Sequence, residues 1–567
     1  MDHAASYVHG ASATPLLGET VGALLDRMAG VWPDRPALVV RQQGIRWTYR
    51  QFLAEVERVA SGLLALGLEP GDRVGIWAPN CAEWVVAQFA APKAGLILVN
   101  INPAYRSHEL SYSLNKVGCR ALILPRAFKA SHYLKLLSGL APELAHAASG
   151  ELSAAALPDL RHVILLDDDV ESGTHRWSDL AGDAAAMKRL REIEATLSFD
   201  DPVNIQFTSG TTGAPKGATL THHNIVNNGY FIGEAMRLTE QDRLCIPVPF
   251  YHCFGMVLGN LVCVTHGACM VIPGEGFDAL ATLETVAEER CTGLHGVPTM
   301  FIAELEHPRF HEFDLSSLRT GIMAGSPCPI EVMRRVVRDM HMAEVTIAYG
   351  MTETSPVSFQ TVPDDPLDRR VATVGRIHPH VEVKLVDEAG HVVPRGTHGE
   401  LLTRGYSVMR GYWGDEESTA VAIDAARWMH TGDLAVLDDE GYCTIVGRLK
   451  DMIIRGGENI SPREIEEFLY GHPDVQDVQV FGVPDEKFGE QVCAWIRLRD
   501  GATTTVAAIQ DYCRHNLAYF KVPHYVRFVD AFPMTVTGKV QKYLMRESMV
   551  AELGQTSPDV HANASTL

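Results

Sequence analysis

The stretch of residues 207–217 constrains the fold most, because it combines three glycines, four hydroxyl side chains and one lysine. Glycines let the backbone approach an anion closely, hydroxyl groups donate hydrogen bonds to it, and a lysine adds a point charge. Residues 203–207 alternate apolar and polar side chains as in a strand, and residues 221–225 are typical of the start of a helix. The stretch therefore predicts a phosphate-binding loop between a strand and a helix, made by Thr208, Ser209, Gly210, Thr211, Thr212, Gly213 and Lys216.

This loop lacks the spacing of a Walker loop. A Walker sequence ends in Gly-Lys followed by Ser or Thr, whereas here Pro215 precedes Lys216 and Gly217 follows it. A GTPase-type switch is therefore disfavoured. The alternative is a solvated Ser/Thr/Gly loop without a ligand, which the two flanking elements disfavour.

Length, charge and cysteine usage narrow the class of protein. A chain of 567 residues is too long for one ordinary core, so we expect two or more domains. The formal net charge of −21 disfavours a nucleic-acid partner and a polybasic membrane surface. No apolar run reaches the length of about 18 residues that crosses a bilayer, and the N-terminus lacks the pattern of a targeting segment. The 11 cysteines form no CxxC pair, which favours reduced thiols and a cytoplasmic location.

Strand-like runs alternate with helical stretches from residue 47 to residue 446, the pattern of parallel α/β layers. Charged residues and a glycine then interrupt two apolar runs at 446–451, which predicts a joint between domains. Beyond it, residues 462–469 indicate a helix with Glu464, Glu466 and Glu467 facing outward, followed by two half-buried strands. We predict an α/β protein with a large N-terminal domain of layered α/β subdomains, residues 1–449, and a small mobile C-terminal α+β domain, residues 450–567.

Five further clusters occur in one order along the chain. They are residues 324–327 (Ala-Gly-Ser-Pro), 349–353 (Tyr-Gly-Met-Thr-Glu), 428–433, 447–457 and 533–539. Together with the loop they resemble the adenylate-forming (AMP-binding) superfamily, which includes acyl-CoA synthetases, aryl-CoA ligases, luciferases and peptide-synthetase adenylation domains. The resemblance covers nearly the whole chain, and residues 249–255 and 450–462 are most similar to medium-chain fatty acyl-CoA synthetases.

Three of the matching residues have chemistry that suits nucleotide activation. Glu353 is a lone carboxylate, which suits Mg²⁺ because this ion keeps most of its waters and takes one or two protein oxygens. Asp433 can accept hydrogen bonds from both hydroxyls of a ribose. Lys539 lies in a loop-like stretch, and its ammonium would stabilise charge on phosphate oxygens in a transition state without transferring a proton. Each would otherwise be an ordinary solvated residue.

The resemblance implies further roles. Thr352 would bind the α-phosphate, Lys450 would be the hinge between the domains, and His252 would be a gate beside the carboxylate of the acid. The other implied contacts are with adenine or ribose, by Tyr349, Gly325, Ser326 and Arg448, and with the pantetheine arm of coenzyme A, by Gly456 and Gly457. The alternatives are a core position for His252 and Tyr349 and a solvated linker at Lys450. No Cys/His cluster has zinc spacing and no Gly-x-Ser-x-Gly motif occurs, so neither another metal ligand nor a covalent nucleophile is predicted.

The resemblance implies an ATP-dependent acyl-CoA synthetase that uses Mg²⁺ and coenzyme A. It would convert a small carboxylic acid to an acyl-adenylate with release of pyrophosphate, and then transfer the acyl group to coenzyme A with release of AMP. The uncharged residues 254–258 beside His252, with residues 357–359, predict an apolar pocket and a medium-chain fatty acid. The alternatives are an aryl or terpenoid acid-CoA ligase, an enzyme that loads a carrier protein, and a catalytically silent adenylate-binding protein. The oligomeric state is left open, with a homodimer among the alternatives.

Overall fold

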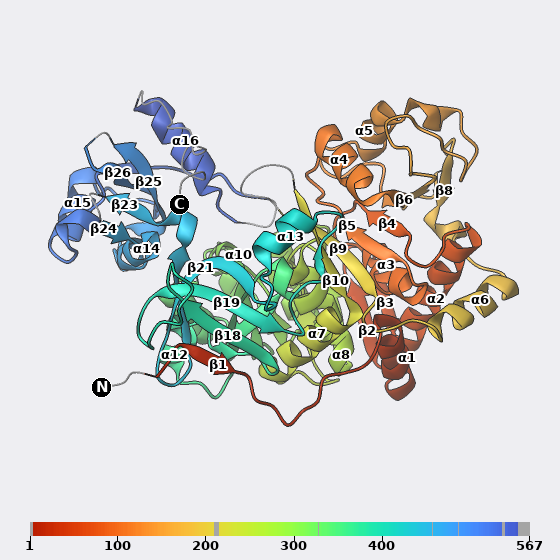
Figure 1. The fold of residues 1–567 in the computed structure, drawn as a ribbon, viewed down its shortest axis with the longest axis horizontal. Coiled ribbons are helices and arrows are strands. Elements are labelled where there is room, and N and C mark those ends of the chain that lie inside the picture. Colours follow the sequence, from red (N-terminus) through yellow and green to blue (C-terminus); the bar gives the residue numbers. More distant parts are fainter. Residues whose placement is uncertain are drawn as a thin grey trace.

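The computed structural model describes residues 4–169, 171–208, 215–326, 328–455, 458–485, 487–535 and 539–553. Three sheets lie in a large N-terminal domain and one in a small C-terminal domain, so the predicted α/β fold class is confirmed (Figure 1). The α-helices are α1 (Val21–Val31), α2 (Tyr49–Ala65), α3 (Ala82–Lys93), α4 (Ser107–Val117), α5 (Tyr133–Leu140), α6 (Ala184–Glu194), α7 (His222–Met236), α8 (Val262–His266), α9 (Ala279–Glu289), α10 (Pro298–Leu305), α11 (Ile330–Asp339), α12 (Leu367–Ala372), α13 (Glu416–Ala422), α14 (Pro462–Tyr470), α15 (Val506–Arg514) and α16 (Lys542–Glu552).

The first N-terminal sheet has eight strands in the order β20-β10-β9-β5-β4-β6-β7-β8. Strands β4 to β9 run parallel, whereas β10 is antiparallel to β9 and β20 is antiparallel to β10. Apolar residues fill both faces of the central strands, as expected where helices cover both sides of a parallel sheet. The strands are β4 (Arg73–Ile76), β5 (Ile97–Asn100), β6 (Cys119–Leu124), β7 (His162–Leu165), β8 (Thr174–Arg176), β9 (Pro202–Thr208), β10 (Lys216–Thr221) and β20 (Gly411–Tyr412).

The second N-terminal sheet has nine strands in the order β17-β16-β15-β14-β13-β11-β12-β2-β3. Its six central strands run parallel, and β3, β16 and β17 pair antiparallel at the two edges. The main hydrophobic core joins both sheets with α1, α2, α3 and α8. The strands are β2 (Pro36–Val40), β3 (Ile45–Thr48), β11 (Arg243–Cys245), β12 (Cys269–Ile272), β13 (Gly293–Leu294), β14 (Thr320–Ala324), β15 (Glu344–Gly350), β16 (Val357–Gln360) and β17 (Arg376–Ile377).

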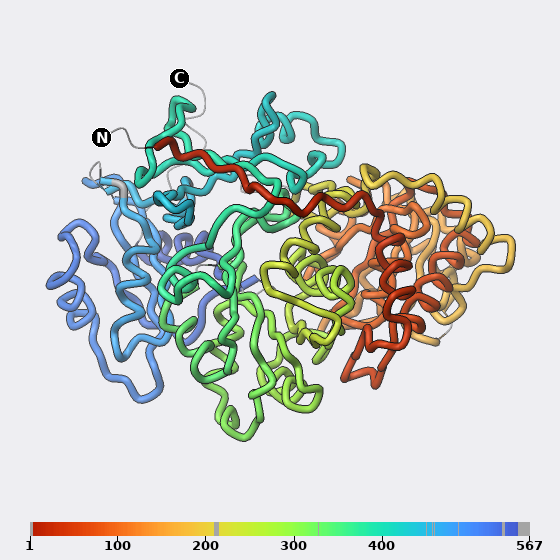
Figure 2. The backbone as a smooth tube through the Cα atoms, turned by 90° about the horizontal axis from the view of Figure 1, so that it is seen from below, coloured from red at the N-terminus to blue at the C-terminus, as the bar shows by residue number. Residues whose placement is uncertain are grey.

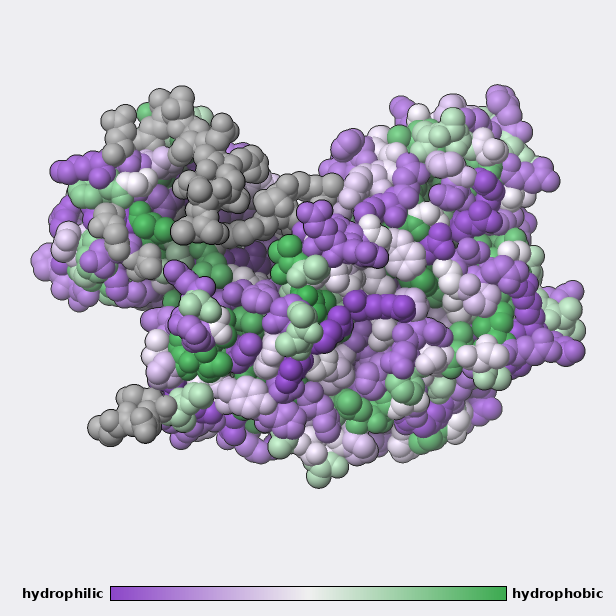
Figure 3. Space-filling model, in the orientation of Figure 1, coloured by the Kyte–Doolittle hydropathy of each residue, from purple (hydrophilic) through white to green (hydrophobic). Residues whose placement is uncertain are grey.

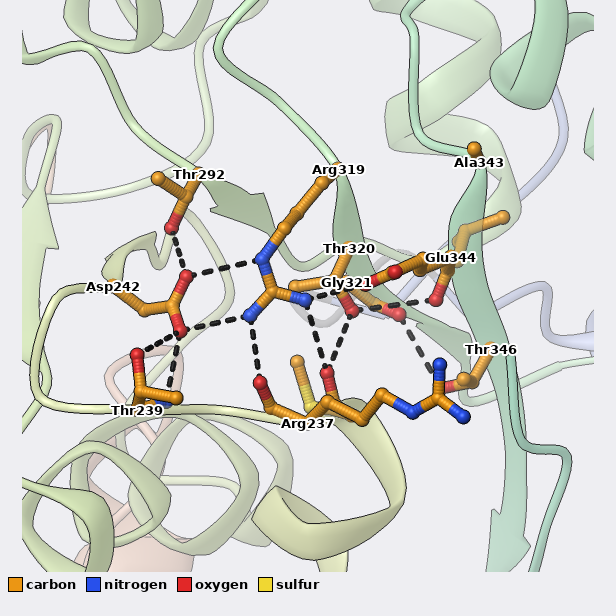
Figure 4. A network of polar contacts seen from close by, with 12 residues as sticks. Arg237, Thr239, Asp242, Thr292, Arg319, Thr320, Gly321, Ala343, Glu344 and Thr346 are labelled. Carbon is orange, nitrogen blue, oxygen red and sulfur yellow. Dashed lines mark hydrogen bonds and ion pairs between the residues drawn. The ribbon is translucent and has the colours of Figure 1, made fainter. Parts of the chain in front are cut away.

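A network of polar contacts fastens the amino ends of three strands of this sheet (Figure 4). Arg319, directly before β14, donates to Asp242 (Nη2 to Oδ2, 2.8 Å) and to Glu344, the first residue of β15. Thr292 donates to the second oxygen of Asp242 at 2.6 Å. These contacts hold the starts of the strands. The predicted site residues Gly325, Ser326, Thr352 and Glu353 follow the opposite, carboxyl ends of β14 and β15.

The third N-terminal sheet is antiparallel, in the order β1-β18-β19-β21-β22. Its first strand comes from the N-terminus, and the chain then runs along the outside of the domain to α1 (Figure 2). Its last strand leads through the short helix η6 (Leu449–Asp451) into the C-terminal domain. The strands are β1 (Tyr7–His9), β18 (Val381–Val386), β19 (Gly399–Gly405), β21 (Met429–Leu437) and β22 (Cys443–Arg448).

The C-terminal domain has a sheet in the order β24-β23-β26-β25, with β27 paired to β26. Helices α14 and α16 pack against β25. The prediction that Glu466 of α14 faces outward is wrong: its carboxylate is buried and accepts from Val480 N (2.7 Å) and Lys542 Nζ (2.6 Å), which join α14, β25 and α16. The strands are β23 (Ile453–Arg455), β24 (Glu458–Ile460), β25 (Val475–Asp485), β26 (Gly489–Leu498) and β27 (Tyr525–Phe528).

The predicted order of strand, loop and helix at residues 203–225 is wrong in one respect. β10 lies between the loop and α7 and pairs with β9, so the loop joins two antiparallel strands. Helix α7 begins only after Thr221, which caps it by accepting the main-chain N–H of Asn224 at 3.1 Å. The predicted residues Ser209, Gly210, Thr211, Thr212 and Gly213 lie outside the described residues, as do Gly456 and Gly457.

Hydrophilic residues cover most of the face drawn in Figure 3, and the hydrophobic residues form small, separate groups on it. Within the described part of the chain, no helix is long and apolar enough to cross a membrane. All 11 cysteines are buried and free, as predicted.

Candidate active site

The predicted site residues meet where β14 and β15 end. Gly325 and Ser326 directly follow β14, and Thr352 and Glu353 lie in the short helix η5 (Thr352–Thr354) after β15. Because β14 and β15 are adjacent parallel strands, their carboxyl ends lie side by side, the usual place for ligands in such sheets. Tyr349, at the end of β15, completes the group.

Glu353 is buried and held by two hydroxyl groups. Its Oε1 accepts from Tyr412 Oη at 2.9 Å and from Thr208 Oγ1, the last residue of β9, at 3.3 Å. Burial and the nearby Glu353 carboxylate raise the pKa of Tyr412, so this phenol stays a donor. Lys216 lies with its Nζ 5.2 Å from the centre of the Tyr412 ring, a cation–π distance. The two ends of the predicted loop, Thr208 and Lys216, thus stand beside the predicted metal ligand.

Asp433 forms a second polar group with two other predicted residues. Tyr349 donates its hydroxyl to Asp433 Oδ2 at 2.5 Å, and Arg448 Nε lies 3.4 Å from Oδ1. Asp433 and Arg448 are direct partners in the register of β21 and β22, which fixes them face to face. Burial raises the pKa of the Asp433 carboxyl, and Arg448 counteracts that shift. A half-buried carboxylate with one cation beside it suits a neutral polyol such as ribose.

Lys539 reaches this site from the C-terminal domain. Its main chain is tied to Thr535, which donates N–H to Lys539 O at 2.7 Å and accepts the Lys539 N–H at 3.1 Å. The side chain passes over Gly325, where a Cβ would stand 3.8 Å from Lys539 Cε and 3.1 Å from Val297. Gly325 also has a φ of 91°, which favours glycine. Burial, with Arg448 nearby, lowers the pKa of Lys539.

A small cavity joins Lys539 to His252. It is lined by Val248, Pro249, His252, Phe254, Val297, Gly325 and Lys539. The Nδ1 atom of His252 accepts the main-chain N–H of Phe254 at 3.2 Å. Burial, together with the positive charge of Lys539, lowers the pKa of His252 to about 3, so the ring is neutral at neutral pH. Because the His252 ring is neutral, Lys539 is the cation among the described residues that line this cavity.

Residues 254–258, predicted to line an acid pocket, form the start of a buried π-helix, η3 (Phe254–Leu261). Phe254 lines the small cavity, whereas the sulfur of Met256 points to the amides of Asn100 and Gln206, at 3.4 and 3.7 Å. Val357 and Phe359 are buried as well. Phe254 therefore lines a cavity whose wall is mostly apolar but includes His252 and Lys539, and the surroundings of Met256 are partly polar.

A larger cavity of about 340 Å³ lies between the two domains. Pro249, which also lines the small cavity, forms part of its wall, together with Tyr251 and Met300 of the N-terminal domain and Arg497 and Met534 of the C-terminal domain. No feature of the sequence predicts this cavity or the contact of Tyr412 with Glu353. The bulky apolar residue at 300 and the lone tyrosine at 412 belong to no motif, so only the folded chain brings them to the site.

The residues present fit a magnesium ion at Glu353. Among the described residues no donor reaches Glu353 Oε2, because both hydroxyls bond to Oε1. The described residues also form no cluster of three or more His, Cys, Asp or Glu with metal-binding geometry. One free carboxylate oxygen is what Mg²⁺ needs from a protein when phosphates and waters supply the other ligands.

Lys450, the predicted hinge residue, has its main chain in η6, between β22 and β23.

Comparisons with known proteins agree over nearly the whole chain. Residues 25–413 match the AMP-binding enzyme family, and residues 464–539 match the C-terminal domain of AMP-binding enzymes. The chain is 49% identical over 556 residues to the medium-chain acyl-CoA ligase ACSF2, mitochondrial, of Danio rerio, covering 97% of this chain and 91% of that one. It is 51% identical over 538 residues to the putative acyl-CoA synthetase YngI of Bacillus subtilis (strain 168), covering 94% and 98%. A crystal structure of the anthranilate CoA ligase AuaEII in complex with anthranoyl-AMP superposes with a TM-score of 0.83 at 27% identity, covering 95% and 99%.

Proposed function

We propose that the chain, which belongs to the AMP-binding enzyme family, is an ATP-dependent acyl-CoA synthetase for medium-chain fatty acids. The position of Lys539 supports this proposal most. This side chain comes from the C-terminal domain, yet it lines the same cavity as His252 and lies over Gly325. A cation at that position can stabilise the negative charge that develops when a carboxylate attacks a phosphate.

In the first half-reaction a carboxylate oxygen attacks the α-phosphorus of ATP, and the bond to pyrophosphate breaks. Negative charge builds up on the non-bridging oxygens, and the Lys539 ammonium stabilises it without transferring a proton. Asp433 accepts the ribose hydroxyls, with Arg448 and Tyr349 fixing its orientation through the contacts described above. The hydroxyl of Thr352, 3.7 Å from Cys253 Sγ, is the donor to the α-phosphate.

Glu353 would hold a magnesium ion, whose positive charge would neutralise the phosphates of ATP. The chain's own contribution is to orient the carboxylate. Tyr412 and Thr208 both donate to Oε1, and Oε2 has no donor among the described residues. Lys216, at the other end of the loop, adds a point charge for the same phosphates.

In the second half-reaction the thiolate of coenzyme A attacks the acyl carbonyl, and AMP leaves with the electron pair of the carbon–oxygen bond. Lys539 and the pantetheine arm cannot occupy one small cavity together, so the C-terminal domain has to move between the steps. The short segment η6, with Lys450 at its centre, is the single described link from β22 to β23 and is the proposed hinge.

The acid is proposed from the relatives and from the mostly apolar wall of the cavity that Phe254 lines. The zebrafish relative is named a medium-chain acyl-CoA ligase, and at 49% identity over 97% of this chain it supports the same substrate class here. The anthranilate CoA ligase is a structural relative at 27% identity, which keeps an aryl acid as the second candidate. The cytoplasmic location stays a prediction, and the same zebrafish relative is named as mitochondrial.

The decisive experiment measures AMP formation with ATP and Mg²⁺ across straight-chain acids of increasing length and a set of aryl acids, with and without coenzyme A. We expect AMP formation that depends on coenzyme A. Its kcat/KM should rise along the medium-chain acids, by a factor that corresponds to up to about 0.8 kcal/mol of binding free energy for each buried methylene. Best activity with aryl acids would replace the fatty-acid proposal. AMP formation with a carrier protein but not with coenzyme A would indicate a loading enzyme, and no pyrophosphate exchange with any acid would indicate a silent binding protein.

A further inference from the structure

The carboxylate of Glu306, in the N-terminal domain, contacts two residues of the C-terminal domain. Glu306 follows α10, and its Oε2 accepts from the side-chain amide of Gln476 in β25. Its Oε1 lies 3.2 Å from Nη1 of Arg499, which follows β26. Residues 475 and 498 are direct partners in the register of β25 and β26, so Gln476 and Arg499 stand at the same end of the paired strands. Glu306 therefore contacts the C-terminal domain where β25 begins and β26 ends, through Gln476 and Arg499.

The N-terminal domain holds Glu306 in place from its own side. Arg335 of α11 lies with Nη1 3.5 Å from Glu306 Oε1. The helix dipole disfavours a carboxylate at the C-terminal end of a helix, so the charge of Glu306 does not stabilise α10. The two arginines and the amide offset this cost: Arg499 and Gln476 belong to the other domain, and Arg335 belongs to the neighbouring helix.

Strand β25, which contains Gln476, is also bonded to the segment that follows Lys539. Lys542, at the start of α16, donates its Nζ to Val480 O of β25 at 2.9 Å and to the buried Glu466 at 2.6 Å. Because Lys542 is three residues after Lys539, these bonds tie the catalytic loop to the middle of β25. Holding the end of β25 on the N-terminal domain therefore sets where Lys539 lies.

A second contact docks the same two domains nearby. The carboxylate of Glu467 in α14 lies near the main-chain N–H of Ile330, the first residue of α11, which opposes the rise in its pKa that burial causes. The main-chain N–H groups at the N-terminus of a helix have no partner within the helix, so a carboxylate is favourable there. Glu306 and Ile330 thus place both contacts on the pair α10 and α11, and Met300, in the first turn of α10, lines the cavity between the domains.

We propose that Glu306 is a positioning residue that latches the C-terminal domain in the arrangement in which Lys539 enters the active site. The proposal rests on the proposed function, because it assigns the latch to one of two half-reactions. With the latch closed the chain is set for adenylate formation. The transfer to coenzyme A requires the latch to open, so loss of Glu306 slows the first half-reaction and leaves the second unchanged or faster.

The test compares Glu306→Ala with Arg499→Ala, Gln476→Ala and the double variant Glu306→Ala/Arg499→Ala. The matched control is Glu312→Ala, since Glu312 is exposed and bonds only to the nearby Arg309 among the described residues. ATP–pyrophosphate exchange reports the first half-reaction, and thioester formation from supplied acyl-adenylate reports the second. We expect Glu306→Ala to lower exchange about three- to tenfold, a modest change because the ion pair is partly exposed, with thioester formation undiminished. The double variant should resemble Glu306→Ala, because Glu306 and Arg499 are the two partners of the same ion pair.

A readout that needs no activity separates failure of the latch from failure of the proposed function. Trypsin cleaves after lysine and arginine, and the segment 448–455 between the domains contains Arg448, Lys450 and Arg455. We expect Glu306→Ala to be cut there several times faster than wild type or Glu312→Ala. Equal losses in both half-reactions, or unchanged exchange with unchanged cleavage, would overturn the latch. A wild-type protein without exchange would overturn the proposed function, and the cleavage rates would then still decide whether Glu306 holds the domains together.

Discussion

At the scale of the residue, the site depends on single charged groups whose partners come from distant parts of the chain. Lys539 is the clearest case, because it lies in the C-terminal domain but lines a cavity of the N-terminal domain. We expect Lys539→Ala to lower ATP–pyrophosphate exchange by about a hundredfold or more, the loss that follows removal of one transition-state donor. Thioester formation from supplied acyl-adenylate should stay within a few-fold of wild type. Lys521→Ala, which removes a lysine paired with Glu464 in the same domain, is the control. A similar loss in both half-reactions would mean that Lys539 is structural.

Tyr412 is the residue whose role the sequence did not indicate and whose hydroxyl donates to Glu353. We expect Tyr412→Phe to raise the KM for Mg²⁺-ATP about tenfold, the effect of one hydrogen bond to a charged group, and to change kcat less. The ring remains, so its contact with Lys216 remains as well. Tyr7→Phe removes a similar bond, Tyr7 Oη to Glu382 at 2.7 Å, in the third sheet and is the matched control. Magnesium titration of the exchange reaction measures the effect, and an unchanged KM would show that Thr208 alone orients Glu353.

At the scale of the element, the segment η6 joins the two domains, and Lys450 is at its centre. A proline there fixes φ, which restricts rotation about the joint more than the binding of ATP and acid. We expect Lys450→Pro to keep pyrophosphate exchange within a few-fold of wild type and to slow thioester formation at least tenfold. Lys450→Ala removes the side chain without fixing φ, so it should retain both half-reactions. If the proline variant formed thioester as fast as the alanine variant, the hinge would lie elsewhere.

Elements with a strong local pattern were predictable, and those defined by pairing were not. The family, the fold class, the strand before the loop and the helix at 462–469 follow from motifs and periodicity, and the structure and the comparisons confirm them. Strand β10 was missed because its alternation is only a few residues long and its hydrogen bonds come from β9. Glu466 was misplaced because a glutamate on a helix is exposed by default, and its burial is explained by two partners distant in the sequence, the main chain of Val480 and the ammonium of Lys542. The roles of the site residues stay predictions for the same reason, since they depend on ligands that bind across three sheets and two domains.

At the scale of the whole molecule, buried histidines make the fold sensitive to acid. Burial lowers the pKa of His222 and His295 to about 4 and that of His378 to about 3, whereas an unfolded histidine titrates near 6.5. Below pH 6.5 the unfolded chain takes up protons that the folded chain cannot bind. The stability from these three groups is therefore complete above about pH 6.5 and is lost as the pH falls, by about 1.4 kcal/mol per unit for each histidine. Glu304 acts in the opposite direction. Burial raises its pKa, so the folded chain binds this proton more tightly than the unfolded chain, and the contribution of Glu304 to stability grows as the pH falls.

One of these histidines can be tested against the rest of the molecule. The ring of His378 shares a hydrogen bond with Gln360 Oε1 at 3.0 Å, and a glutamine amide can donate the same bond without titrating near neutral pH. We expect the melting temperature of wild type to fall between pH 7.5 and pH 5, and that of His378→Gln to fall less steeply, because one proton fewer is bound on unfolding. The comparison rests on the slopes with pH, so a constant loss of stability from imperfect packing of the glutamine does not affect it. His391→Gln, a change at a highly exposed histidine, should give a curve parallel to wild type. Parallel curves for all three proteins would mean that His378 takes up its proton as readily in the folded chain as in the unfolded chain, and the acid sensitivity would then come from other groups, such as His222 and His295.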